Sequence, residues 1–136
     1  MPEPVWLSRR MVELFHLEQI REHGGLPGLR DPGALEAALH RAQNKWHYGD
    51  ERDVCALAAA YGYGIAMAHP FVDGNKRAAF LSMYVFLGLN GRELDAEEVE
   101  TVLVMRGLAA GELGEGELAA WLRDWTVDIP PEGGGR

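Results

Sequence analysis

The stretch HPFVDGNKRAAFLSMYVFLGL, residues 69–89, decides how this chain is organised. Its first nine residues are mostly polar or turn-forming, and the residues from Ala78 onward are apolar almost all round at helical spacing. A helix that lacks a polar face is normally a buried one. The stretch therefore predicts a loop that runs into the N-terminus of a central, buried helix beginning near Gly74 or Asn75.

Glycine and proline mark turns that divide the rest of the chain into further helices. Ser8 is a suitable N-cap for a first helix that ends at Gly24, and Asp31 followed by Pro32 opens a second. No segment alternates between apolar and polar residues for long enough to indicate a strand. The remaining helices are expected over residues 53–68, 95–107 and 116–127, with Asp95 as the N-cap of the second of these.

These segments predict an all-α protein, a compact bundle of about six helices with the loop of residues 69–74 at the N-terminus of the central helix. A chain of 136 residues is the size of one domain. We expect that domain to span residues 1–127. Residues 128–136 are expected to form a disordered C-terminal tail, because they are rich in proline and glycine.

The composition is that of an ordinary globular protein, with 47% hydrophobic and 25% charged residues. The formal net charge of -8 disfavours direct nucleic-acid binding through a basic surface. The apolar runs are too short to cross a bilayer, so no membrane association is expected. The N-terminus lacks a signal-peptide pattern and Cys55 is the only cysteine, and both features predict a cytoplasmic protein.

Residues 69–77 combine the parts of a phosphoryl-transfer site. The helix start offers unpaired backbone N–H groups at the positive end of its dipole, and Gly74 lets a ligand approach them. Lys76 and Arg77 add two cations, which are unfavourable there unless an anion such as phosphate is bound. Asp73 is suited to hold Mg²⁺ that already has phosphate ligands, and His69 is suited to take a proton from an attacking hydroxyl. The set predicts transfer of a phosphorus-centred group to a hydroxyl.

The spacing excludes two other kinds of site. A Walker P-loop needs a Ser or Thr directly after its lysine and a second glycine upstream, and neither accompanies Lys76. A zinc site needs further His or Cys ligands, and none lies at ligand spacing from His69.

The run from His69 to Arg77 resembles the HPFx(D/E)GN(G/K)R signature of the Fic/Doc superfamily. Lys76 stands where Fic adenylyltransferases usually have glycine, which is similar to the Doc branch, the death-on-curing toxins of type II toxin–antitoxin operons. The segments 24–28 (GGLPG) and 31–33 (DPG) are similar to the Doc pattern after its first helix. The resemblance covers about residues 5–127.

This resemblance implies a Fic-type all-α fold and a transferase that uses ATP and Mg²⁺. His69 would be the general base towards a Ser or Thr hydroxyl of a target protein, Asp73 the Mg²⁺ ligand and Phe71 a buried structural anchor. The residues that would bind the nucleotide phosphates are Gly74, Asn75, Lys76 and Arg77. In the Doc branch the γ-phosphate is transferred, elongation factor Tu is the target and translation halts.

Two departures from the Fic pattern bear on activity and its control. Phe80 occupies the position where Fic adenylyltransferases often carry a second arginine, so this helix places no polar group behind the phosphates one turn on. No (S/T)xxxE(G/N) inhibitory motif follows any of the four serines and threonines. Inhibition is therefore expected from a second chain, a separately encoded antitoxin.

Two alternative functions remain open at this point. The first is a Fic-like protein adenylyltransferase that transfers AMP, which Lys76 disfavours. The second is a catalytically dead module that only binds an antitoxin, which the intact His69 and Asp73 disfavour.

Several residues outside the motif are candidates for partner contacts. Trp46, His47 and Tyr48 are expected in a connector after the second helix. The resemblance to Fic proteins implies that such a connector forms a flap that aligns the target peptide by strand pairing, and packing of Trp46 onto the third helix is the alternative. The other helical histidines, which are His16, His23 and His40, are expected at the surface or at the edge of the core.

The small residues Ala58, Gly62 and Gly64 predict a groove beside the central helix, in which an amphipathic antitoxin segment would dock. The net charge of -8 indicates basic residues at the rim of that segment.

Overall fold

The computed structural model of the chain describes residues 2–130. Six α-helices and two short strands make up this part of the chain, which confirms the all-α bundle of about six helices. The elements are α1 (Arg9–His23), α2 (Pro32–His47), α3 (Val54–Ala68), α4 (Asn75–Leu89), β1 (Arg92–Leu94), α5 (Glu98–Ala109), α6 (Glu115–Trp125) and β2 (Thr126–Asp128). Within residues 2–130 no helix is both long and apolar enough to span a bilayer.

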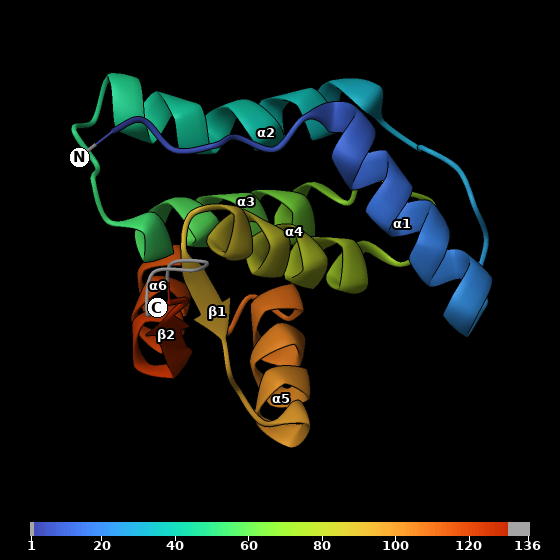
Figure 1. Cartoon of the computed structure of the whole chain (residues 1–136). Helices are drawn as coiled ribbons and strands as arrows, with labels where there is room; N and C mark the ends of the chain where they lie inside the picture. The colour runs from blue at the N-terminus through green and yellow to red at the C-terminus, as the bar shows by residue number, and fades with distance from the viewer. Residues whose placement is uncertain (1, 131–136) are drawn as a thin grey trace.

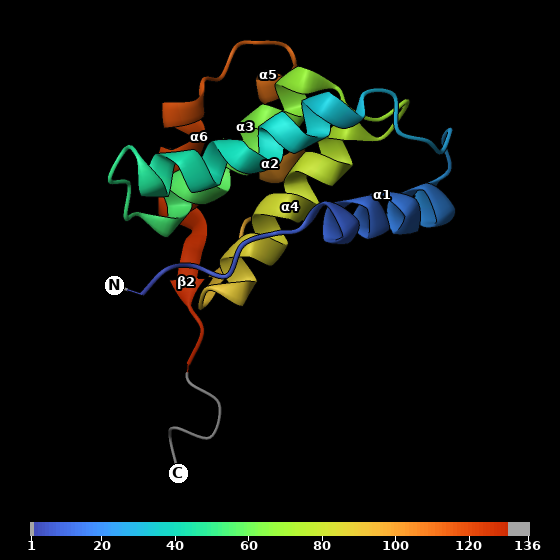
Figure 2. The same cartoon turned by 90° about the horizontal axis from the view of Figure 1, so that it is seen from above.

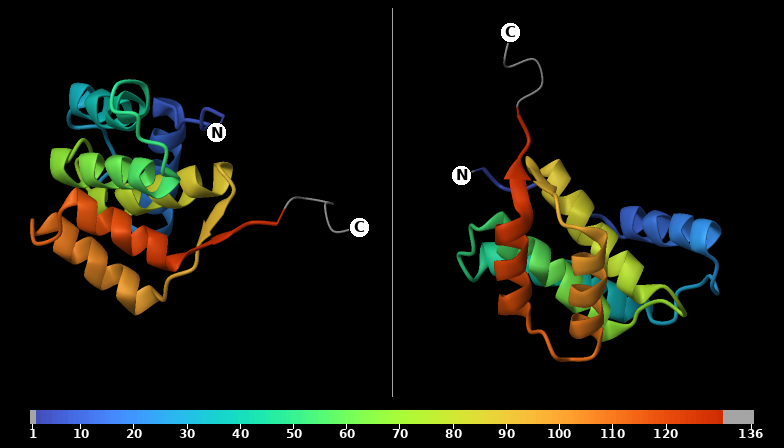
Figure 3. Two further views of the ribbon diagram at one scale, coloured as in Figure 1. Left: turned by 90° about the vertical axis from the view of Figure 1, so that its left-hand side faces the viewer. Right: turned by 90° about the horizontal axis from the view of Figure 1, so that it is seen from below.

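The helices pack in three layers (Figures 1 and 3). α3 and α4 lie against each other in the middle, α1 and α2 cover one side of this pair, and α5 and α6 cover the other. The loop of residues 69–74 joins the two middle helices at one end of the bundle. The start of α4 is therefore held between both outer layers, where residues from several elements meet.

α3 is the most buried helix of the bundle, and α4 is buried along one face. Ala58, Ala59 and Ala60 have no exposed surface, so that neighbouring helices approach α3 closely on several sides. α4 buries residues such as Met83 and Phe86, whereas its Tyr84 remains 40% exposed. The expectation of a helix buried all round thus fits α3 better than the helix that starts at the motif.

At two of the three small residues that predicted a groove, Ala58 and Gly62, no space is left open. A Cβ added to Gly62 would lie 2.3 Å from Sδ of Met83, and one added to Gly64 would lie 3.2 Å from Cβ of Ala38. Ala58 is fully buried. The prediction of a docking groove is therefore wrong for Ala58 and Gly62, which provide close packing of α3. Gly64 does line a cavity of about 410 Å³ against α2, and its occupation by an antitoxin segment stays a prediction.

The first two helices begin where the capping signals placed them. The Ser8 hydroxyl accepts a hydrogen bond from the Met11 N–H at 3.2 Å, and Asp31 Oδ1 accepts one from the Ala34 N–H at 3.0 Å. Each bond satisfies an N–H group that lacks a partner inside the helix. Figure 2 shows the segment before α1 crossing the end of α4, where the Asn90 side chain bonds both the N–H and the carbonyl of Val5.

The two-stranded antiparallel sheet was not expected from the sequence. β1 pairs with β2 so that Glu93 lies opposite Val127, and the Asp95 N–H extends the ladder by donating to the Trp125 carbonyl at 2.8 Å. Because Asp95 is extended, α5 begins three residues later at Glu98, which corrects the expected N-cap. Asp128 belongs to β2, so the chain is ordered past residue 127; residues 131–136 of the expected tail lie outside the described range.

Candidate active site

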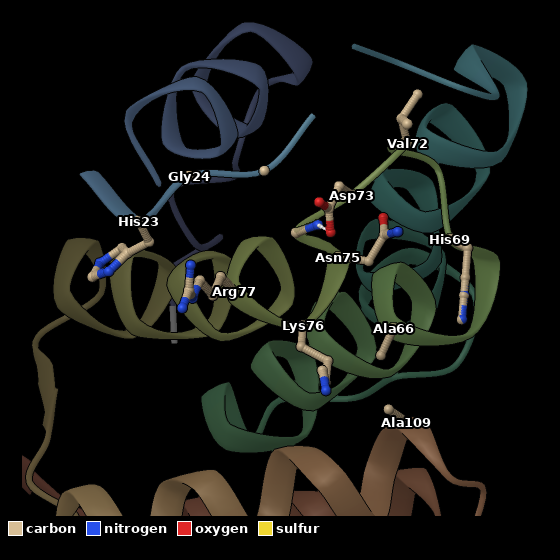
Figure 4. A pocket seen from close by; sticks show the side chains of 12 residues that line it. His23, Gly24, Ala66, His69, Val72, Asp73, Asn75, Lys76, Arg77 and Ala109 are labelled. Carbon is tan, nitrogen blue, oxygen red and sulfur yellow. Dashed lines mark hydrogen bonds between the residues drawn. The ribbon is translucent and has the colours of Figure 1, made fainter. Parts of the chain in front are cut away.

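The motif opens onto a cavity of about 570 Å³ at one end of the bundle (Figure 4). His69 stands on one side of this cavity, His23 and Arg77 stand on the opposite side, and Asp73 and Lys76 lie between them. The cavity is lined by His23, Gly24, Gly25, Ala66, His69, Val72, Asp73, Gly74, Asn75, Lys76, Arg77 and Ala109. Four of the helices and the connector after α1 thus contribute to one site.

His69 is held in an unusual backbone conformation at the C-terminus of α3. Its φ of 49° and ψ of 56° lie in the left-handed region, which disfavours residues with a Cβ. Arg30 stabilises this turn from the connector: its Nε donates to the His69 carbonyl at 2.8 Å and its Nη2 to the Ala68 carbonyl at 3.0 Å. The imidazole is exposed and lines the cavity, so it is accessible to a substrate.

The connector between α1 and α2 forms one wall of the motif loop through backbone pairing. The N–H groups of Arg30 and Asp31 both donate to the Pro70 carbonyl, at 2.7 and 3.0 Å. The Val72 N–H donates to the Gly28 carbonyl at 3.0 Å, and Leu29 forms an isolated β-bridge with Phe71. The loop is therefore fixed along its length rather than free.

Phe71 is buried, with 2% of its surface exposed, and has the geometry of an anchor. Its ring stacks on His16 at a centroid distance of 3.8 Å and an interplanar angle of 7°. The Asn75 side chain bonds the Phe71 backbone twice, because its Oδ1 accepts from the N–H and its Nδ2 donates to the carbonyl, each at 2.9 Å. Asn75 lines the cavity, but its Oδ1 and one of its two Nδ2 hydrogens are already bonded to the Phe71 backbone, and these bonds close the loop.

His16 belongs to the site, although the sequence placed it at the surface or the core edge. It is only 4% exposed, and its Nε2 lies 2.7 Å from the Asp73 carbonyl oxygen. Because a carbonyl only accepts, Nε2 must carry the proton that joins them. His16 thus supports both Phe71 and the backbone of Asp73 from α1.

The Asp73 carboxylate is fixed at the mouth of the cavity by two backbone donors. Its Oδ1 accepts from the Gly74 N–H at 2.8 Å and its Oδ2 from the Leu26 N–H at 3.2 Å. Gly25 leaves the space that the carboxylate needs: its φ is +116°, and a Cβ there would lie 2.8 Å from Oδ2. Each oxygen keeps further lone pairs for a ligand.

The N-terminus of α4 faces the cavity without a side-chain cap. Gly74 has a φ of 76°, and no side chain of the described residues caps the helix. The first backbone N–H groups of the helix are consequently available to an anion. Lys76 and Arg77 are exposed here, and within residues 2–130 neither forms an ion pair.

These residues fit Mg²⁺ only in company with phosphate. No group of three or more His, Cys, Asp or Glu side chains among residues 2–130 is arranged to hold a metal ion by itself. Mg²⁺ commonly takes one or two carboxylates together with substrate phosphates and water. A single fixed carboxylate, Asp73, beside a cationic anion site matches that requirement.

Residues 6–87 match the Fic/DOC family. The chain belongs to the Fic/Doc family. "Protein kinase doc" of Escherichia phage P1 is 38% identical over 118 residues, which cover 86% of this chain and 92% of the relative. "Toxin Doc" of Mycolicibacterium smegmatis is 39% identical over 75 residues, which cover 54% of this chain and 58% of that relative. Both relatives carry the name of the Doc branch, as the resemblance in the motif implied.

The Fic/Doc motif residues meet in one cavity, but the proposed flap residues do not reach it. Trp46 and His47 belong to the last turn of α2, and Trp46 is 8% exposed, with its ring 6.3 Å from that of Trp6. α2 has 16 residues and is therefore about 24 Å long. Its other end, next to Asp31, contacts the motif loop, so Trp46, His47 and Tyr48 lie at the opposite end of the helix from the site.

Proposed function

We propose that this chain transfers the γ-phosphate of ATP to a Ser or Thr hydroxyl of a protein of the translation machinery, with elongation factor Tu as the expected target. The observation that carries the proposal is the common cavity of His69, Asp73, Lys76 and Arg77 at the uncapped N-terminus of α4. A base, a carboxylate and an anion cradle are thus within reach of one bound nucleotide.

Each of these residues has one task in the transfer. The target hydroxyl oxygen attacks the γ-phosphorus, the bond from phosphorus to the β,γ-bridging oxygen breaks, and ADP leaves. His69 takes the hydroxyl proton as the new oxygen–phosphorus bond forms. The N–H groups of α4 and the cations of Lys76 and Arg77 stabilise the charge on the phosphate oxygens. Mg²⁺, held by Asp73, would neutralise the phosphates further.

Lys76 is the reason to propose phosphate transfer rather than AMP transfer. Its side chain lies between His69 and Arg77 in the cavity, at the position where the AMP-transferring relatives usually have glycine. An ammonium group there occupies space that glycine leaves open, and it favours a different set of phosphate oxygens. The "Protein kinase doc" name of the phage relative supports the same choice.

Neutralisation by an antitoxin is the second part of the proposal, and α5 offers an exposed apolar face for it. Val99 and Leu103 are one helical turn apart and are 71% and 59% exposed. The first turn of α5 carries Glu98 and Glu100 beside this face. The antitoxin segment is therefore expected to be amphipathic with basic residues at its rim, as the net charge of -8 also indicates.

Mass spectrometry of purified elongation factor Tu after incubation with this chain, ATP and Mg²⁺ tests the transfer. A gain of about 80 Da on a Ser or Thr indicates phosphate, and a gain of about 329 Da indicates AMP. His69→Ala is expected to lower the rate about 10²–10⁴-fold without unfolding the protein, because the exposed ring serves proton transfer. A folded His69→Ala protein that transfers at the parental rate contradicts the assignment of the base.

Co-expression with the product of the neighbouring gene, followed by size-exclusion chromatography, tests the antitoxin contact. Leu103→Asp is expected to prevent the complex from forming. Val127→Asp is a matched control, because Val127 is 49% exposed on β2, away from α5. Loss of the complex in both variants, or in neither, contradicts docking on α5.

A further inference from the structure

A second cavity of about 340 Å³ lies between α4 and α5 and borders the motif. This α4–α5 groove has two kinds of lining residue: the cations Lys76, Arg77 and Arg106, and the apolar side chains of Phe80, Val102 and Met105. Lys76 and Arg77 also line the motif cavity. The two cavities therefore border the same two side chains.

The charge of the α4–α5 groove differs from that of the chain as a whole. The chain has 21 acidic and 13 basic residues, yet no carboxylate lines the groove. Within residues 2–130, no carboxylate oxygen lies within 4.0 Å of the Arg106 guanidinium, whereas Arg41, Arg92 and Arg123 each hold one. Three cations without partners around one groove indicate an anionic ligand.

Arg106 is supplied by an element that the motif does not include. The sequence showed no polar group one turn after Arg77, because Phe80 stands where a second arginine is often found. Arg106, an exposed residue of α5, lines the same groove as Phe80. α5 also lies beyond residues 6–87, the range that matches the family.

We propose that the α4–α5 groove binds the nucleoside end of the donor nucleotide and that Arg106 contacts its α-phosphate. This inference rests on the proposed function, which requires the γ-phosphate to lie beside His69. The rest of the nucleotide then passes Lys76 and Arg77 and enters the groove. The side chains of Phe80, Val102 and Met105 in the lining offer apolar surface to a planar base.

The size of the site agrees with this assignment. Ligand cavities that bury most of a drug-sized molecule measure about 300–1,000 Å³. The motif cavity supplies the charged groups of the motif, and the groove adds the apolar side chains of Phe80, Val102 and Met105, against which a purine base can pack. Met105 is 6% exposed, so its position is set by the fold before any ligand binds.

Calorimetric titration of the full chain with Mg²⁺ and ATP, ADP, AMP or inorganic pyrophosphate tests the assignment. Arg106→Ala is expected to weaken AMP and ATP alike, by about 5- to 20-fold, and to leave pyrophosphate, which matches the β- and γ-phosphates alone, within about twofold. Arg106→Lys is expected to recover part of the loss, because it restores the charge without the planar fork. Arg10→Ala is the matched control, since Arg10 is an exposed arginine on α1 and within residues 2–130 forms no ion pair.

Each of the following results would contradict one part of the proposal. If Arg106→Ala weakens pyrophosphate as much as ATP and leaves AMP unchanged, the groove holds the phosphate end and the orientation is wrong. If Arg106→Ala binds every ligand as Arg10→Ala does, Arg106 makes no contact, although wild-type binding of ATP leaves the proposed function intact. A wild-type chain that binds none of the nucleotides overturns both proposals.

Discussion

Replacing His69 with glycine is expected to make the protein inactive and yet more stable than the alanine variant. With φ at 49° and ψ at 56°, this residue occupies the left-handed region, where a side chain costs about 1–2 kcal/mol. Glycine avoids that cost but loses about 0.5–1 kcal/mol through its greater freedom in the unfolded chain. We therefore expect His69→Gly to be about 0.5–1 kcal/mol more stable than His69→Ala.

Urea unfolding of the two variants at pH 7 measures this difference. Both variants lack the imidazole, so the comparison isolates the backbone. The expected gain corresponds to a rise in Tm of about 2–4 °C for a chain of this length. A His69→Gly protein that is equal to or less stable than His69→Ala would refute the inference of backbone strain at this position.

The contribution of Arg30 provides an independent check of the same strain. Its two hydrogen bonds to the carbonyls of Ala68 and His69 are charge-assisted, and Arg30→Met is expected to cost about 1–3 kcal/mol. In a double-mutant cycle with His69→Gly the cost is expected to be smaller, because a glycine adopts this turn without support. Strict additivity of the two substitutions would show that Arg30 does not offset strain at His69.

Three further changes have defined outcomes. Lys76→Gly is expected to lose phosphate transfer, measured by mass spectrometry; unchanged transfer removes the main reason for preferring phosphate to AMP. Gly25→Ala displaces the Asp73 carboxylate, so the Mg²⁺ concentration for half-maximal transfer is expected to rise, without a change for Gly116→Ala on α6, where an added Cβ meets nothing. Burial alone would raise the pKa of Glu115, but hydrogen bonds from Lys45 and Arg41 lower the pKa overall. Glu115→Gln is therefore expected to reduce the free energy of unfolding by about 1 kcal/mol at neutral pH. In urea titrations this reduction is expected to become progressively smaller below pH about 4.5, where the carboxylate is protonated.

The features that sequence predicted well are local ones. Ser8, and Asp31 with Pro32, mark helix starts because a cap satisfies N–H groups within three residues of itself. The motif likewise contains its own base, carboxylate and cations, so their meeting in one cavity followed from nine consecutive residues. The three-residue strands β1 and β2 are too short for an alternating pattern, and they pair across 32 or more positions of the chain.

The residues that sequence missed support the motif from a distance. His16 reaches Asp73 across 57 positions, and Arg30 reaches His69 across 39. Neither residue belongs to a periodic pattern or to a recognisable spacing, so only the packing of α1 and its connector reveals them. The groove expected beside Gly62 is absent for the same reason. Small residues indicate that other groups approach closely, but only the packing shows that Met83 fills the space beside Gly62.

The way in which His69 is held favours an enzyme over a module that only binds a partner. A binding surface has no need of a strained residue, and glycine would satisfy the same turn at lower cost. Here a histidine is kept in the left-handed conformation, its carbonyl is held by Arg30, and its ring is left exposed to the cavity. This conformation is adopted where an imidazole shares a cavity with a fixed carboxylate and an uncapped helix N-terminus, which is where proton transfer to a base would occur.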